Sequence, residues 1–160
     1  MDDNQISTYE YTYDEQGRQV KVSMLDREGE PEDVIGYTAK EKAYDENNFC
    51  IREVYYGSEG IIRQDLYTYD DRGNLIRTKQ IDGTIDKPAM TEYDYNEHDL
   101  LVEKREYYNI GELSGKTVYE YDTNGLLAQT QVYDLLSRDR PETHFIYEYS
   151  DSNRVVKKYR

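Results

Sequence analysis

The feature that most constrains this chain is a sixfold repeat in which a tyrosine is followed, four residues later, by glycine, asparagine or aspartate. Successive anchor tyrosines are separated by roughly 25 to 31 residues, a spacing typical of repeat architectures. The six anchors are Tyr13, Tyr44, Tyr69, Tyr95, Tyr121 and Tyr149. We therefore expect a tandem array of one small unit.

The position four residues after each anchor predicts a tight turn. Glycine adopts a positive φ without steric cost, and asparagine and aspartate tolerate this region best among the other residues. An acid or amide follows most anchors directly, and such a side chain at the first position of a turn caps the backbone amides that come after it. This combination predicts a three-residue hairpin loop closed by a bulge. The six turn residues are Gly17, Asn48, Gly73, Asp99, Gly125 and Asn153.

The residues before each anchor alternate in polarity with period two, as expected for a half-buried strand. The inward row is expected to be Tyr9, Tyr11 and Tyr13 in the first repeat and Phe145, Tyr147 and Tyr149 in the last. Intervening residues such as Glu10 and Glu120 are expected to face water. The strand after each turn begins with two adjacent apolar residues, for example Leu75 and Ile76. Adjacent residues of a strand face opposite sides, which suggests that the sheet is covered on both faces at this end of the hairpin.

These patterns predict an all-β chain without helices, folded as one antiparallel meander of about six tandem hairpins and about twelve strands. The meander is expected to form a twisted or rolled single sheet, and residues 1–160 to form a single domain. The hairpins are expected near residues 8–25, 37–56, 62–81, 90–108, 116–133 and 143–160. All three prolines, Pro31, Pro88 and Pro141, fall in the connectors, where a missing amide donor is least costly.

The composition limits both the core and the partners. A formal net charge of −14 and a low aliphatic content are typical of disordered chains, but 19 tyrosines supply the apolar faces that aliphatic residues do not. The acidic balance argues against nucleic-acid binding, because phosphate contacts need clustered lysine and arginine. The same field favours a basic protein partner. Oligomeric state is left open.

Residues that carry chemistry are sparse. His98 and His144 lie in different repeats and outside any ligand or nucleophile motif, and the single Cys50 stands where other repeats have an aliphatic residue. Asp70, Asp71 and Asn74 lack the spacing of a calcium loop, and turn formation explains them better. We therefore expect no enzyme activity, no catalytic or metal site and no cofactor, and the partner-binding residues are left unassigned.

No segment resembles a signal peptide or has the length of a membrane span. The expected location is the cytoplasm if Met1 is the natural start, and otherwise the cell surface or the medium.

Three segments carry a resemblance to a known family: Tyr119–Leu127, Tyr67–Leu75 and Tyr11–Arg18. They resemble the YD repeats of RHS and teneurin-type proteins, and the second, fourth and sixth repeats are degenerate copies. The resemblance covers nearly the whole chain from about Thr8. It implies a β-sheet scaffold that encloses a toxin or presents an adhesive surface, and no catalyst. Six hairpins are too few to enclose a cargo, and the self-cleaving core motif is missing, so the chain resembles a small stand-alone relative.

The leading hypothesis is a small acidic bacterial immunity protein that blocks a cognate toxin by covering its basic surface. Two alternatives remain. One is a secreted or surface YD-repeat module that binds carbohydrate or protein, and the other is a structural fragment of a larger RHS-type shell.

Overall fold

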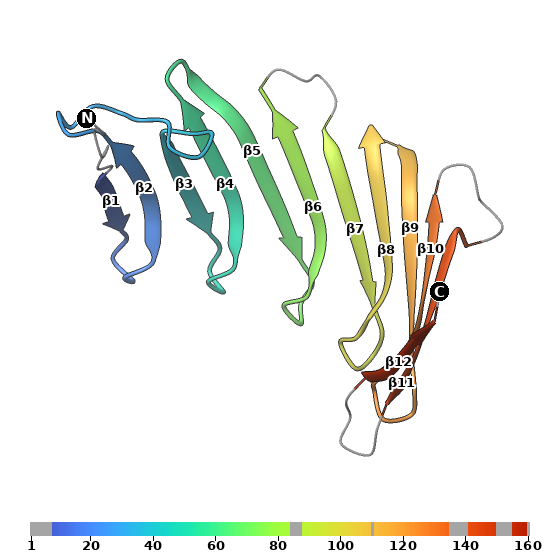
Figure 1. Cartoon of the computed structure of the whole chain (residues 1–160). Helices are drawn as coiled ribbons and strands as arrows, with labels where there is room; N and C mark the ends of the chain where they lie inside the picture. Colours follow the sequence, from blue (N-terminus) through green and yellow to red (C-terminus); the bar gives the residue numbers. More distant parts are fainter. Residues whose placement is uncertain (1–7, 84–87, 110, 135–140, 150–154, 160) are drawn as a thin grey trace. The chain divides into compact units, whose positions relative to one another are not determined.

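The structure, a computed structural model, describes residues 8–83, 88–109, 111–134, 141–149 and 155–159 (Figure 1). These residues form strands and loops, and none of them is helical. The strands follow one another in a single antiparallel meander, in sequence order from β1 to β12. The strands are β1 Thr8–Tyr13, β2 Gln19–Leu25, β3 Ala39–Tyr44, β4 Cys50–Gly57, β5 Gly60–Tyr69, β6 Leu75–Asp82, β7 Ala89–Tyr95, β8 Leu101–Asn109, β9 Glu112–Tyr121, β10 Leu127–Asp134, β11 Thr143–Tyr149 and β12 Val155–Tyr159.

The all-β antiparallel meander is thereby confirmed, whereas the division into six equivalent hairpins stays a prediction. The search for a membrane-spanning helix among the described residues finds none. Contacts divide the chain into two units, Met1–Thr68 with Lys79–Pro88, and Tyr69–Thr78 with Ala89–Arg160. The assignment of one domain stays a prediction.

The predicted turn geometry is present at the five turns that the structure describes. The fourth residue after the anchor has a positive φ in each: Gly17 76°, Asn48 68°, Gly73 89°, Asp99 60° and Gly125 77°. In the first turn, the Gly17 amide donates to the Asp14 carbonyl at 3.0 Å, and the Asp14 amide donates to the Arg18 carbonyl at 3.0 Å. The strand register shifts beside Tyr13, as a closing bulge requires. The sixth turn residue, Asn153, lies outside the described residues.

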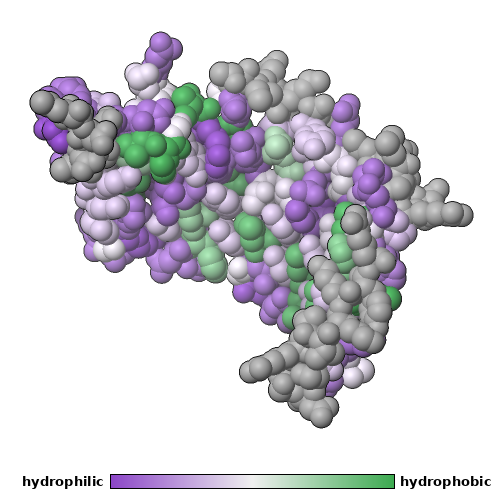
Figure 2. Space-filling view, viewed as in Figure 1, coloured by the Kyte–Doolittle hydropathy of each residue, from purple (hydrophilic) through white to green (hydrophobic). Residues whose placement is uncertain are grey.

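The buried apolar residues of the first unit lie on β2 and β4. Met24 is 1% exposed, and Val22 and Val54 are also buried. The connector after β2 is bonded to the main chain of Met24: the Glu32 amide donates to the Met24 carbonyl and the Met24 amide donates to the Thr38 carbonyl, both at 2.8 Å. Elsewhere hydrophobic residues are scattered among hydrophilic ones on the face seen in Figure 2. Half-buried tyrosines therefore take the place of a thick core.

This connector also contains a turn that the repeat pattern did not predict. Asp26 accepts hydrogen bonds through Oδ1 from the amides of Glu28 and Glu30, at 3.0 and 2.8 Å. Gly29 has a φ of 85°, and Pro31 bridges back to Leu25. The geometry matches that of the anchor turns, although Leu25 stands where they have tyrosine.

The inward placement of the first tyrosine row is wrong. Tyr9, Tyr11 and Tyr13 are 43%, 52% and 58% exposed. In the last repeat, by contrast, Phe145 and Tyr147 are half-buried. The difference arises because β1 stands first in the strand order, so no return strand of an earlier repeat lies beside it among the described residues.

Candidate interaction site

Four of the anchor tyrosines link their repeat to the one before it. The Tyr44 hydroxyl donates to the Gln19 carbonyl at 3.0 Å, so its partner is the first residue of the preceding return strand. Three further anchors make the same bond: Tyr95 to Leu75 at 3.1 Å, Tyr121 to Leu101 at 2.8 Å and Tyr149 to Leu127 at 2.8 Å. In every case the acceptor lies six residues after the previous anchor. These tyrosines therefore connect successive repeats. The sequence pattern placed them in the sheet but did not predict these bonds, because it assigned each tyrosine to its own hairpin.

Strands of neighbouring repeats also meet in one fixed register. The residue eight positions after an anchor always pairs with the residue three positions before the next anchor. This holds at all four described junctions, with the pairs Lys21 and Glu41, Arg52 and Leu66, Glu103 and Val118, and Gln129 and Ile146. The repeat thus fixes which side chains meet across every such junction.

In the first unit, this register gathers charged and aromatic side chains around Glu53 on β4. The Glu53 carboxylate accepts hydrogen bonds from Tyr55 at 2.7 Å and Tyr67 at 3.2 Å. The ammonium groups of Lys40 and Lys42 lie 3.3 and 3.4 Å away. Burial alone would raise the pKa of Glu53, but the Tyr55 hydrogen bond and the two lysines hold it below its ordinary value. Four donors already surround this carboxylate, which argues for a structural role over an acid–base one.

Arg63 extends the cluster. Its guanidinium binds Asp65 in a bidentate manner, with Nη2 2.5 Å from Oδ2, and stacks 4.4 Å from the centre of the Tyr55 ring. The rings of Tyr37 and Tyr55 pack edge to face, with their centres 5.1 Å apart and their planes at 82°. Burial and the Glu53 hydrogen bond raise the pKa of Tyr55 well above its ordinary value, so this hydroxyl stays a hydrogen-bond donor even in mildly alkaline solution.

A second ionic network lies in the other unit, around Arg105 on β8. This guanidinium contacts Asp94 at 2.6 Å, Glu103 at 2.5 Å and Glu92 at 3.5 Å. Glu92 also pairs with Arg77 at 2.9 Å. Burial would raise the pKa of Glu92, but hydrogen bonds from Arg77 and Tyr107 lower it. The charges of this network are therefore largely neutralised by one another.

The acidic side chains of the anchor turns fall into two groups. Some accept hydrogen bonds from backbone amides of the turn, and others do not. Directly after the anchor, Asp14 accepts bonds from the amides of Gln16 and Arg18 at 3.0 and 2.9 Å. Asp45, Asp70, Asn96 and Asp122 do the same in their turns. Burial would raise the pKa of Asp70, but these bonds and that from the Asn74 side chain lower it. The aspartates at this position are turn caps, and Asp70 and Asn74 are bonded to each other as part of the turn.

The second residue after the anchor is different. Glu15, Glu46, Asp71 and Glu97 are exposed, and they occupy this position in four of the five described turns. Within the described part of the chain, Glu15, Glu46 and Asp71 make no hydrogen bond or ion pair, and Glu97 meets only His98 at 3.6 Å. We call these four residues the turn-tip acids. Their carboxylates are exposed and take no part in building the turn.

The other candidate residues do not converge on a site. His98 is exposed at a turn, and the His144 ring nitrogen lies 2.7 Å from the Gln129 amide oxygen. Cys50 is half-buried, and burial raises the pKa of its thiol. No cluster of three potential His, Cys, Asp or Glu metal ligands occurs among the described residues.

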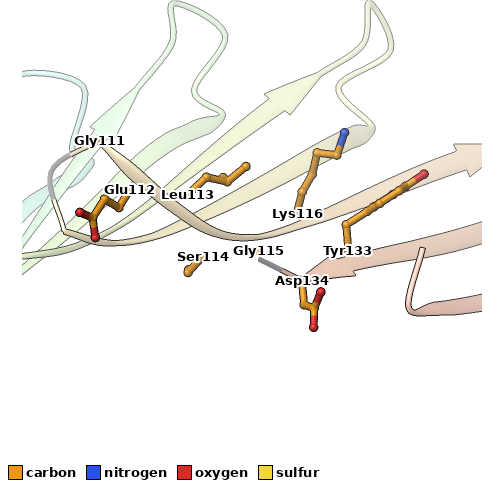
Figure 3. A pocket seen from close by; sticks show the side chains of 8 residues that line it. All are labelled: Gly111, Glu112, Leu113, Ser114, Gly115, Lys116, Tyr133 and Asp134. Carbon is orange, nitrogen blue, oxygen red and sulfur yellow. The ribbon is translucent and has the colours of Figure 1, made fainter. Parts of the chain in front are cut away.

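A hollow in the second unit lies beside β9 and β10 (Figure 3). Lys116 and Tyr133 lie on one side of the strands, with the ammonium 4.8 Å from the ring centre. Ser114 and Asp134 point to the other side. Because its polar groups diverge, this hollow does not orient them toward a common ligand atom.

No family model and no curated protein matches the chain. Its fold is similar to a segment of the crystal structure of TcdB2-TccC3-Cdc42, with a TM-score of 0.70 and 17% identity over 97% of this chain. The chain spans 7% of that chain's length. The Tc holotoxin pore of Photorhabdus luminescens (TM-score 0.49, 14% identity, 95% of this chain and 10% of that one) is too distant for an inference. The same holds for a Bacteroides fragilis protein of unknown function, BF3112 (TM-score 0.21, 12% identity, 98% of this chain and 92% of that one).

The likeness to TcdB2-TccC3-Cdc42 extends over nearly the whole chain and shows the fold alone. It agrees with the β-sheet architecture that the YD-repeat resemblance implies.

Proposed function

We propose that this chain is a non-catalytic protein-binding module, and more specifically an acidic immunity protein that covers the basic surface of a bacterial toxin domain. The observation that carries the proposal is the pair of turn-tip acids in each unit, Glu15 and Glu46 in the first and Asp71 and Glu97 in the second. These side chains are exposed and are not needed for the turn, yet the repeat places an acid there in four of five described copies.

The spacing of the turn-tip acids suits a partner with an extended basic surface. Successive anchor turns within a unit lie two strands apart, which corresponds to about 10 Å from strand spacing alone. Exposed charges contribute little to the stability of the chain that carries them, but they accelerate the capture of an oppositely charged partner. The cytoplasm is the location that such a partner requires before export, and it forms part of the proposal.

Growth rescue tests the proposal directly. The chain is co-expressed with the product of the gene next to its own, and colony survival is compared with that of cells expressing that product alone. We expect rescue by the natural chain and its loss in a variant with Glu15→Lys, Glu46→Lys, Asp71→Lys and Glu97→Lys. A matched variant that reverses four acids elsewhere on the surface, Glu28, Glu30, Glu59 and Glu142, should still rescue. Equal behaviour of the two variants would contradict the role of the turn-tip acids, and absence of rescue by the natural chain would contradict the immunity function.

A structural segment of a larger YD-type shell is a second candidate. It is favoured by the exposed tyrosine row of β1 and by the small share of the TcdB2-TccC3-Cdc42 chain that the present fold spans. In that case the chain should be found only within a longer polypeptide in cell extracts, which an antibody against the described repeats would detect by size.

A further inference from the structure

Two of the five described anchor turns reverse the chain with a residue other than glycine. Asn48 and Asp99 have φ values of 68° and 60°, a conformation that glycine adopts without steric cost. They belong to the second and fourth repeats, whereas the first, third and fifth repeats have glycine at this position. A side chain at a position that favours glycine points to a task beyond reversal of the chain.

In the first unit, the Asn48 side chain is bound by an arginine of the preceding turn. Nη1 of Arg18 donates to Asn48 Oδ1 at 2.7 Å and reaches the Asp45 carbonyl at 3.5 Å. Nε of the same guanidinium donates to Asp14 Oδ2 at 2.6 Å, and the group lies 4.8 Å from the centre of the Tyr44 ring. One guanidinium thus joins the cap of the first turn to the cap and the turn residue of the second.

In the second unit, Arg72 makes the same three contacts. Its Nη1 lies 2.8 Å from Asp99 Oδ1 and donates to the Asn96 carbonyl at 3.2 Å, and its Nε lies 3.7 Å from Asp70 Oδ2. The Asn74 side-chain amide also donates to Asp99 Oδ1, at 2.7 Å. The arginine of the first unit comes five residues after its anchor and this one comes three residues after. The likeness of the repeats therefore does not by itself account for the shared contacts.

The following junction of the second unit has no such link. No hydrogen bond or ion pair joins residues 96–100 to residues 122–126, all of which the structure describes. Leu100 stands at the repeat position of Arg18, and its Cδ1 lies 3.8 Å from the place that a Cβ on Gly125 would take. The turns are thus joined in pairs, the first with the second and the third with the fourth, and each pair lies within one unit.

We call the contact sets of Arg18 and Arg72 the turn clasps, and we propose that each clasped pair of turns is one docking element for two cationic groups of a partner. Strand spacing sets these groups about 10 Å apart. In the described structure neither arginine pairs with a turn-tip acid, although each has one within three residues in its own turn. The inference rests on the proposed function, because it takes the turn-tip acids as contact residues.

The two arginines are positioning residues in this arrangement. Exposed ion pairs add little to the stability of a folded chain, whereas ordering a surface before binding lowers the entropy that association costs. A clasp therefore acts mainly by presenting two turn-tip acids of one unit as an ordered pair. Without it, the two carboxylates would meet the partner as independent groups on mobile turns.

An NMR titration of the isotope-labelled full chain with a short oligolysine peptide at low ionic strength tests the proposal. Asn48→Gly keeps the positive φ and the net charge but removes the acceptor, and Arg18→Lys keeps the charge but loses the planar guanidinium. We expect either change to raise the dissociation constant read at the Glu15 and Glu46 amides about threefold, and to lower their heteronuclear NOE. The double variant should bind no more weakly than either single one, because both changes remove the same link.

The second clasped pair is the internal control. Dissociation constants read at the Asp71 and Glu97 amides should stay unchanged in Asn48→Gly and Arg18→Lys. Arg72→Lys should reverse the pattern, with weaker binding at the second pair and unchanged binding at the first.

Two results would overturn the role of the clasps. Equal weakening at both pairs would show a general loss of structure, and unchanged binding at the first pair in Asn48→Gly and Arg18→Lys would show that the clasp does not position its acids. Neither result contradicts the proposed function, which needs only that the acids be exposed. A natural chain whose turn-tip amides do not respond to the peptide would overturn both. The expected peptide results without growth rescue would support the clasps and contradict the immunity function.

Discussion

At the scale of single residues, each anchor turn has two parts with separate tasks. The residue with positive φ reverses the chain, and the acid or amide after the anchor binds two backbone amides. Both tasks are local, so residue type and spacing were sufficient to predict them. Asn48 and Asp99 show that the first task does not require glycine.

Replacement of Gly17 tests the backbone requirement by itself. An added Cβ would meet no atom within 4 Å, so any loss of stability comes from the φ of 76°. We expect Gly17→Ala to lower the free energy of unfolding by about 1 kcal/mol. Gly17→Asn should lower it less, because Asn48 adopts the same conformation in the next turn. Urea unfolding measures both, and equal losses for the two variants would contradict this explanation.

The anchor hydroxyl can be tested with an internal control. Tyr121→Phe keeps the ring but removes the bond to the Leu101 carbonyl, so we expect a loss of about 1 kcal/mol or somewhat more. Tyr13→Phe should change stability by much less in dilute solution, because the Tyr13 hydroxyl has no acceptor in the described structure. Thermal or urea unfolding of the pair checks this, and a comparable loss in both variants would show that the hydroxyl bond is not the cause.

At the scale of elements, the sequence predicted the strands better than the relations between them. The outer bounds of β1 and β2 lie where the first hairpin was expected, at Thr8 and Leu25. The anchor bond was not predictable from one repeat, because Tyr121 and its acceptor Leu101 are separated by 20 residues. The exposure of the first tyrosine row was missed for the same reason, since burial of an anchor depends on the preceding repeat. The Asp26 turn could have been found from the Asp-x-x-Gly spacing it shares with three anchor turns.

The Glu53 cluster joins three neighbouring strands and gives the first unit a defined response to acid. The pKa of Glu53 in the folded chain lies below its ordinary value of 4.5. Its carboxylate therefore contributes stability above about pH 4.5, and this contribution is lost as the pH falls through the folded value. We expect Glu53→Gln to lower the free energy of unfolding by about 1–3 kcal/mol at pH 7, because Lys40 and Lys42 lose a charged partner.

The same substitution should flatten the decline of stability between pH 5 and pH 3, which urea unfolding at several pH values measures. Glu46→Gln is the matched control, because Glu46 is exposed and makes no ion pair in the described structure. It should leave both stability and slope unchanged. A Glu53→Gln variant with the same slope as the natural chain would contradict the assigned role of this carboxylate.

At the scale of the whole molecule, the contacts between strands follow the sequence. The strand pairs in contact are neighbours in chain order, from β1 with β2 to β11 with β12. A chain of this kind approximates a one-dimensional array, whose stability is the sum of its repeats and their junctions. The composition resembles that of a disordered protein because such an array has only a small buried core. The hydrogen bonds that anchor tyrosines make between repeats compensate for this small core.

Removal of the last repeat tests this additivity. A chain that ends at Asp134 loses β11 and β12, the pairing from Gln129–Ile146 to Val132–Thr143 and the bond from Tyr149 to Leu127. Because none of the described pairings of β2 or β4 is removed, we expect amide hydrogen exchange around Met24 and Val54 to stay as slow as in the full chain. Exchange should accelerate on β10, whose pairing with β11 is lost. A cooperative loss of protection on β2 and β4 would instead show that the repeats unfold as one unit, and the additive description would then be wrong.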